Sequence, residues 1–121
     1  MTSKVQPLVH AEISVIPILG SEAAAIVVDS DPESDTGMSK QIAIAFDAIR
    51  RVKDVNAILT PMGTQIETGS FENILKAVEA AHQSLRTTSG VKRIVSTIRI
   101  DERLDKSATL EDKVKSVKEK L

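Results

Sequence analysis

Two glutamates stand inside stretches that otherwise have the pattern of β-strands, and they are the side chains best suited to chemistry. Glu12 lies among alternating apolar residues, and Glu67 lies in the second arm of an expected hairpin. Glutamate is disfavoured within strands, which suggests a functional reason for its presence. Each carboxylate either points outward from a wetted sheet face or binds a cation or a ring amino group. A glycosidase-type acid/base pair is the remaining alternative, and no sugar-binding pattern favours it.

The other residues that could take part in catalysis have simpler structural explanations. His82 falls at helical spacing with apolar neighbours, which favours a hydrogen-bonded histidine at the edge of the core over a catalytic base. Ser14 has no G-x-S-x-G motif around it, so nucleophilic catalysis has no support. The chain contains no cysteine and two histidines, so it offers neither thiolate chemistry nor an all-histidine metal site. We predict no catalytic residue, no metal ligand and no cofactor.

Length and composition narrow the possible partners. The chain has 121 residues, about one domain, and its 41% hydrophobic and 27% charged residues are typical of a globular protein. A formal net charge of −1 and an aromatic content of 2% argue against nucleic-acid binding, which uses a positive field and stacking side chains. No apolar run reaches the length of a membrane span, and no secretory signal is recognised. We therefore expect a soluble cytoplasmic protein without a nucleic-acid or membrane partner.

One long segment is acidic. Between Ala11 and Ser39 there is no lysine or arginine, and the six carboxylates belong to Glu12, Glu22, Asp29, Asp31, Glu33 and Asp35. A calcium loop of the EF-hand type that starts at Asp29 would need glycine and glutamate where Ser34 and Lys40 stand, so calcium is rejected. A solvated loop is the expected structure of this segment.

The elements that must position these side chains follow from periodicity and from turn residues. They are a strand at 9–17, a helix from its N-cap Ser39 to about 53, a hairpin with arms 55–60 and 64–68, a helix at 71–88, a strand at 93–101 and a helix at 109–121. This β-α-β-β-α-β order with right-handed crossovers predicts an α+β, ferredoxin-like sandwich with an additional C-terminal helix. Residues 1–8 are expected to be a flexible N-terminus, and 9–121 a single domain.

In this fold two helices cover one face of the sheet and leave the other open. The covered face should carry Ala11, Ile13, Val15, Ile94, Ile98 and Ile100. The open face should carry Glu12, Ser14, Ile16, Val95, Thr97 and Arg99, a mixed surface of the kind that marks an interface or a ligand site. The C-terminal helix has an apolar seam spaced 4-3-4, which predicts packing on a helix of the same or a neighbouring subunit. Self-association is therefore expected.

Several strings in combination resemble the small thiamine-binding protein family, related to the YkoF-type thiamine/hydroxymethylpyrimidine-binding domains. They are HAEISVIP at 10–17, LTPMGT at 59–64, EAAH at 79–82, VSTIRID at 95–101 followed by Arg103, Asp105 and Lys106, and the helix around 111–117. The resemblance covers 9–121 and departs from the family at 20–36, where the connection is longer.

The resemblance implies assembly into dimers and tetramers and binding of thiamine, or its hydroxymethylpyrimidine part, without catalysis. The expected ligand contacts are Glu12, Ser14, Thr60, Met62, Thr64 and Glu67. Thiamine diphosphate is expected to bind worse than thiamine, because the segment from Ala11 to Ser39 is acidic. Two alternatives stay open: a structural or regulatory homo-oligomeric module without a ligand, and an enzyme acting on a thiamine precursor, for which no catalytic constellation is visible.

Overall fold

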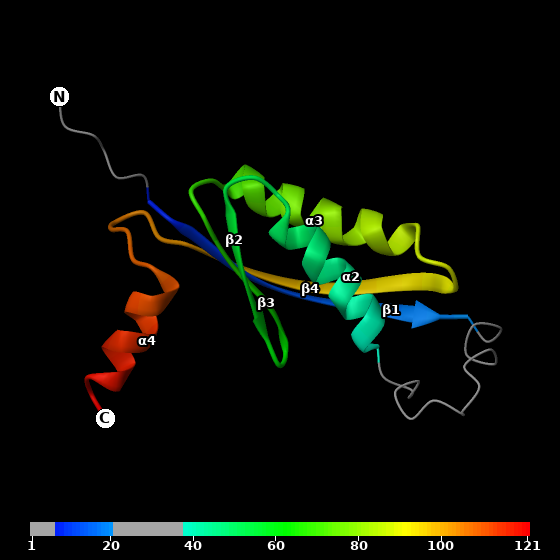
Figure 1. Ribbon diagram of the computed structural model, residues 1–121. Helices are drawn as coiled ribbons and strands as arrows, with labels where there is room; N and C mark the ends of the chain where they lie inside the picture. The colour runs from blue at the N-terminus through cyan, green and yellow to red at the C-terminus, as the bar shows by residue number, and fades with distance from the viewer. Residues whose placement is uncertain (1–6, 21–37) are drawn as a thin grey trace.

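A four-stranded antiparallel sheet organises the chain. The computed structural model describes residues 7–20 and 38–121, so residues 1–6 of the expected flexible N-terminus (1–8) and most of the acidic segment lie outside the described residues. The elements are β1 (Val9–Leu19), α2 (Ser39–Arg50), β2 (Val55–Thr60), β3 (Gly63–Thr68), α3 (Phe71–Arg86), β4 (Val91–Glu102) and α4 (Leu110–Lys118). The strand order is β2-β3-β1-β4 (Figure 1). This is the expected α+β, ferredoxin-like arrangement with an extra C-terminal helix.

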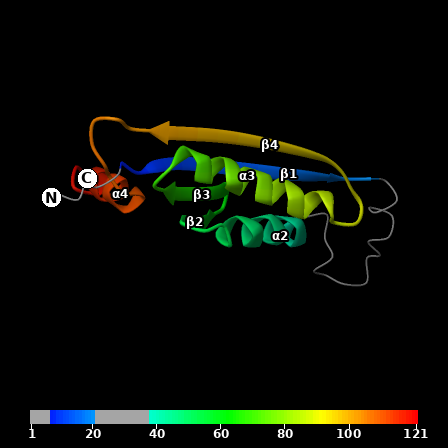
Figure 2. The same cartoon turned by 90° about the horizontal axis from the view of Figure 1, so that it is seen from above.

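Strand register divides the side chains between two faces. Ala11 in β1 pairs with Ile66 in β3 and with Ile100 in β4, so these three side chains share one face. Helices α2 and α3 pack side by side on that face (Figure 2). The buried core consists of Val9, Ala11, Ile13, Ala45, Ile49, Ile66, Ile74, Ala77, Ala81 and Leu85. The expected division into a covered and an open face is confirmed, because alternation along β1 and β4 fixes it.

Helix α2 differs from its expected bounds at both ends. Met38, not Ser39, is the N-cap, and it makes no side-chain capping hydrogen bond. The helix ends at Arg50, three residues before the expected Lys53, and a tight turn leads to Asp54 with φ of 64°. Aspartate tolerates this left-handed conformation better than most residues. Because α2 ends at Arg50, strand β2 can begin at Val55 and run back along the sheet.

Helix α3 begins as expected, because the Ser70 hydroxyl accepts a hydrogen bond from the Asn73 amide at 3.2 Å. Its buried stripe is narrow. Ala77 and Ala81 lie at its centre, whereas the larger Phe71 and Leu75 are exposed. Small side chains at the centre let the helix approach the sheet closely, which leaves the larger residues at the rim in solvent.

Helix α4 has the expected capping box. Thr109 Oγ1 accepts from the Asp112 amide at 2.9 Å, and Asp112 Oδ2 accepts from the Thr109 amide at 3.0 Å. Both views place α4 away from α2 and α3, at the end of the sheet near the start of β1 (Figures 1 and 2). The expected packing on a helix of the same subunit is therefore wrong: Val114 and Val117 are exposed in the single chain. Packing on a neighbouring subunit stays a prediction.

Among the described helices, none combines the length and the apolar character needed to cross a membrane.

Candidate ligand-binding site

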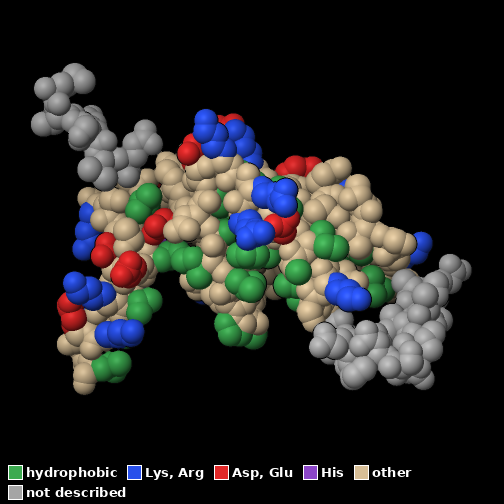
Figure 3. All heavy atoms as spheres, in the orientation of Figure 1, with side chains coloured by type: hydrophobic (Ala, Val, Ile, Leu, Met, Phe, Trp, Pro, Cys, Tyr) green, Lys and Arg blue, Asp and Glu red, His purple; other side chains and the backbone are tan. Residues whose placement is uncertain are grey.

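A pocket of about 530 Å³ lies between the open face of the sheet and α4, and we call it the α4 pocket. Its lining residues are His10, Ala11, Glu12, Gln65, Arg99, Ile100, Asp101, Leu110, Lys113 and Val114. The sheet supplies the floor and α4 supplies one wall. In Figure 3 the surface is hollowed between the protruding helix and the body, and green apolar side chains of α4 face inward.

Glu12 stands at the centre of this floor because β1 is an inner strand. Register places Gln65 of β3 and Arg99 of β4 on either side of it. Gln65 Nε2 lies 3.5 Å from Glu12 Oε2, and Arg99 Nη2 lies 3.5 Å from Glu12 Oε1. Both distances are at the outer limit for hydrogen bonds, so these contacts are weak. The side chain is 35% exposed, so the carboxylate is accessible and has capacity for a stronger donor.

Polar contacts fix α4 as the wall of the pocket. Glu67 Oε1 accepts a hydrogen bond from the Leu110 amide at 2.7 Å and lies 3.1 Å from His10 Nε2. Lys113 Nζ donates to Asp101 Oδ2 at 2.7 Å, and this contact holds the pKa of the Asp101 carboxyl below its ordinary value. A negative side chain at the start of a helix is also favoured by the helix dipole. The orientation of α4 therefore depends on Glu67 and Asp101.

A second, smaller cavity of about 120 Å³ lies beneath α2 at the tip of the β2–β3 hairpin, and we call it the hairpin-tip cavity. Four of the expected ligand contacts line it, namely Ser14, Thr60, Met62 and Thr64, with apolar neighbours such as Phe46. Thr64 pairs with Ile13 and so faces the helices rather than the open face. The six expected residues are thus divided: four line this cavity, Glu12 lines the α4 pocket, and Glu67 sits at the base of α4.

The register also brings in residues that were not expected as ligand contacts. Gln65, Arg99, Asp101 and Lys113 join Glu12 in the α4 pocket. Two carboxylates and two basic groups therefore face one space. Alternation along β4 places Arg99 on the open face. Its partner across the strands, Glu12, is 87 positions away in the sequence. No local pattern carries that information.

The described part of the chain offers no group of three or more potential ligands for a metal ion. His82 Nε2 lies 2.9 Å from the Ser96 hydroxyl, and both side chains are half-buried between α3 and β4. This agrees with the expected hydrogen-bonded histidine at the edge of the core. Neither described cavity reaches this pair.

Comparison with known families decides the relationship. The model of a family described as thiamine-binding protein matches residues 11–118. The chain belongs to this thiamine-binding protein family.

Relatives similar in sequence cover nearly the whole chain. A UPF0045 protein of Methanothermobacter thermautotrophicus is 33% identical over 114 residues, which are 94% of this chain and 100% of the relative. The UPF0045 protein YqgV of Bacillus subtilis is 33% identical over 111 residues, which are 92% and 95% of the two chains.

Solved structures share the fold. A hypothetical protein of Methanocaldococcus jannaschii has a TM-score of 0.69 and 33% identity, covering 93% of this chain and 97% of that one. A candidate thiamine biosynthesis/salvage protein of Thermotoga maritima has a TM-score of 0.63 at 22% identity, covering 92% and 99%. The second likeness supports the fold alone.

Proposed function

We propose that this protein is a non-catalytic, cytoplasmic small-molecule-binding protein that acts as a homo-oligomer, with thiamine or its hydroxymethylpyrimidine moiety as ligand. Membership of the thiamine-binding family supports the ligand class. The observation that carries the proposal is the α4 pocket, where an accessible carboxylate stands at the centre of a cavity of about 530 Å³. That volume is in the range of small-molecule sites, whereas the hairpin-tip cavity falls below it.

The chemistry of the ring system suits Glu12. Thiamine carries a cationic thiazolium and an aminopyrimidine, whose exocyclic amine is a hydrogen-bond donor. A carboxylate that accepts from such a group gains about 1.5–3 kcal/mol. Leu110 and Val114 offer apolar surface on the facing wall for the ring atoms. Glu67 acts indirectly in this proposal, because its oxygen already holds the Leu110 amide.

The remaining expected contacts line the hairpin-tip cavity, which could hold a small part of a ligand. Ser14, Thr60, Met62 and Thr64 surround the hairpin-tip cavity, which has room for a small group only. We keep these four as candidate contacts for a fragment the size of the pyrimidine ring, although the Ser14 side chain shares the open face with Thr97.

Exposed apolar surface supports the homo-oligomer, as a homodimer or homotetramer. Ile16, Ile18 and Val95 are exposed on the open face, and Val114 is exposed on α4 at the opposite end of the sheet. Strand β4 is an edge of the sheet over 12 residues, and such an edge pairs readily with a second chain. The same features favour the second candidate function, a structural or regulatory homo-oligomeric module without a ligand.

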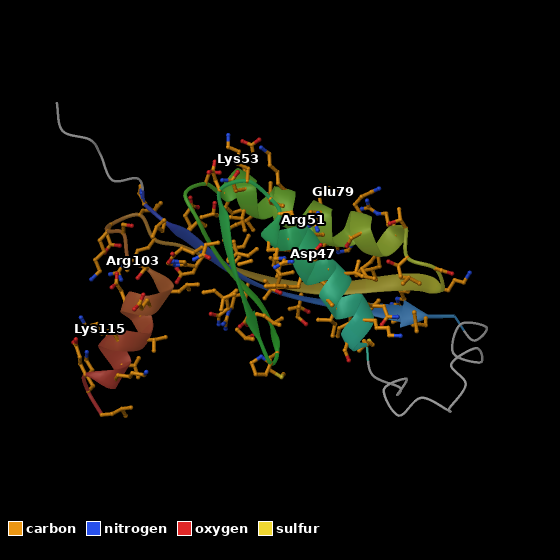
Figure 4. The ribbon with its side chains drawn as sticks, in the orientation of Figure 1. Asp47, Arg51, Lys53, Glu79, Arg103 and Lys115 are labelled. Carbon is orange, nitrogen blue, oxygen red and sulfur yellow. The ribbon has the colours of Figure 1, made fainter. Side chains whose placement is uncertain are left out.

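Titration calorimetry with thiamine, on protein shown to be folded and free of ligand, tests the binding function. We expect binding, and Glu12→Gln should weaken it about tenfold or more, since 1.4 kcal/mol corresponds to a factor of ten. The matched control is Glu79→Gln, because Glu79 pairs with Arg86 on the outer side of α3, away from the pocket (Figure 4). No heat with millimolar thiamine would leave the structural-module function standing. Binding that Glu12→Gln does not alter would move the site elsewhere.

Light scattering tests the assembly. We expect the mass of a dimer or a tetramer at micromolar concentration. The mass of a single chain under these conditions would contradict the homo-oligomer and would remove the support for the module without a ligand.

A further inference from the structure

Two basic side chains line the α4 pocket, and a cationic ligand would have no use for either of them. Arg99 and Lys113 both line it, together with the carboxylates of Glu12 and Asp101. These two pairs of charges balance, so the pocket as a whole has no excess negative charge to attract thiamine. A ligand that uses all four groups must present both a donor edge and an anionic group.

Thiamine has no anionic group, so its binding would leave the Arg99 guanidinium without an anionic partner on the ligand. The Arg99 side chain is 81% exposed, and its contact with Glu12 is the long one of 3.5 Å. A ring amino group or a thiazolium that binds Glu12 competes with this guanidinium, and the thiazolium also places a second positive charge beside it. An anionic group on the ligand removes that conflict, because guanidinium binds phosphate through two parallel hydrogen bonds.

Lys113 stands close enough to share the same anion. Its ammonium already donates to Asp101, which lies two residues from Arg99 on the same face of β4, about 7 Å away along the strand. An ammonium has three donors, so Lys113 can keep Asp101 and still donate to a ligand oxygen. Lys115, by contrast, points outward from α4, away from the pocket (Figure 4).

We propose that the α4 pocket selects a phosphorylated aminopyrimidine of the thiamine type: Glu12 binds the amino edge of the ring, and Arg99 with Lys113 binds the phosphate. This inference rests on the proposed function and names its ligand class. It differs in direction from the expectation that thiamine diphosphate binds worse than thiamine. That expectation counted charges along the segment from Ala11 to Ser39, most of which lies outside the described residues, whereas the cations of the pocket come from β4 and α4.

Calorimetry with thiamine monophosphate, thiamine and inorganic phosphate tests the inference on the full chain. We expect the monophosphate to bind about tenfold more tightly than thiamine, and inorganic phosphate to bind more weakly than the monophosphate. Arg99→Gln should reduce the monophosphate to about the affinity of thiamine. The same variant should tighten thiamine binding, because it removes the competitor for Glu12. Lys113→Gln should lower the monophosphate affinity severalfold.

Two matched controls separate local from general charge effects. Arg93→Gln removes an arginine of the same strand and the same face, opposite Ile18 at the far end of the sheet. Lys115→Gln removes a lysine of the same helix from its outer side. Both should change the preference for the monophosphate by less than twofold.

The outcomes distinguish this inference from the function on which it rests. Equal affinities for thiamine and its monophosphate, or equal effects of Arg99→Gln and Arg93→Gln, overturn the inference and leave thiamine binding in place. Inorganic phosphate that binds as tightly as the monophosphate also overturns it, because the pocket then ignores the ring. No binding of either thiamine compound overturns both.

Discussion

The two faces of the sheet are built on different interactions, although the same strands supply both. Ile13 is buried under the helices, and its neighbour Glu12 faces the α4 pocket. The covered face is apolar and closely packed, so its contacts are many and individually weak. The open face is held by a few polar contacts, among them those of Glu67 and Asp101 with α4. Stability and recognition are thereby separated across one layer of backbone, because successive side chains point to opposite faces.

Substitution of matched isoleucines on the two faces should give the largest difference in the free energy of unfolding. Ile66 on the covered face is 0% exposed, whereas Ile58 on the open face is 40% exposed. Ile66→Ala removes packed methyl groups and leaves a cavity, so the free energy of unfolding should fall by about 2–5 kcal/mol. Ile58→Ala should cost less than about 1 kcal/mol.

Urea denaturation at one fixed protein concentration measures both variants, because association also changes apparent stability. Equal losses at the two positions would remove the distinction between the faces. A loss for Ile58→Ala that depends on protein concentration would instead assign Ile58 to a subunit interface.

Removal of the Glu67 carboxylate should release α4 without unfolding the core. Glu67→Ala deprives the Leu110 amide of its acceptor, and a hydrogen bond to a charged group contributes about 1.5–3 kcal/mol. Hydrogen exchange of the amides in the first turn of α4 should therefore rise by about 10- to 100-fold. Glu67→Gln retains an oxygen acceptor and should give a smaller rise.

Exchange at core amides such as that of Leu85 serves as the internal reference and should not change. If Glu67→Ala speeds exchange equally in α3 and α4, the carboxylate belongs to the stability of the whole domain rather than to the position of α4.

Low pH should loosen α4 as well, but less than the removal of the Glu67 carboxylate does. The Lys113 ammonium lowers the pKa of Asp101, and hydrogen bonds from Thr109 lower the pKa of Asp112, both from the ordinary 3.8. Carboxyls with a lowered folded pKa stabilise fully above their ordinary value and lose that contribution as the pH falls through the folded value. We therefore expect the base of α4 to loosen below about pH 3.8, before the apolar core responds.

A pH titration of amide chemical shifts from pH 6 to 2.5 measures this, with the α4 and α3 signals followed together. Asp101→Asn should remove part of the α4 response. Loosening of α4 that is the same in Asp101→Asn as in the unmodified protein would show that other groups account for the acid response.

Local sequence features predict the elements of this fold well. Ser70 and Thr109 are capping residues whose partners lie three positions away, and the alternation in β4 needs only neighbouring residues. Helix α2 shows the limit of such reasoning. Ser39 is a suitable N-cap by type, yet the cap is Met38, which makes no side-chain hydrogen bond, while Ala45 and Ile49 bury the helix against the sheet.

The composition of the site could not be predicted in the same way. Thr64 was grouped with Glu12, but the register with Ile13 turns it to the covered face, and a shift of one residue would have reversed that result. The contact that fixes α4 uses the backbone amide of Leu110, a group that every residue except proline has. No side-chain pattern identifies such a partner, so the wall of the pocket appears only in three dimensions.

Strands β1 and β4 lie side by side in the sheet, although Glu12 and its neighbour Arg99 are 87 positions apart. Synthesis proceeds at about 5–20 residues per second, so β1 emerges roughly 5 to 15 s before its partner. During that interval one edge of β1 has no strand to pair with. The apolar side chains of Ile16 and Ile18 lie on the same strand and are exposed as well. The last step of folding therefore waits for the C-terminal part of the chain, and chains truncated before Val91 should aggregate rather than form a smaller version of this domain.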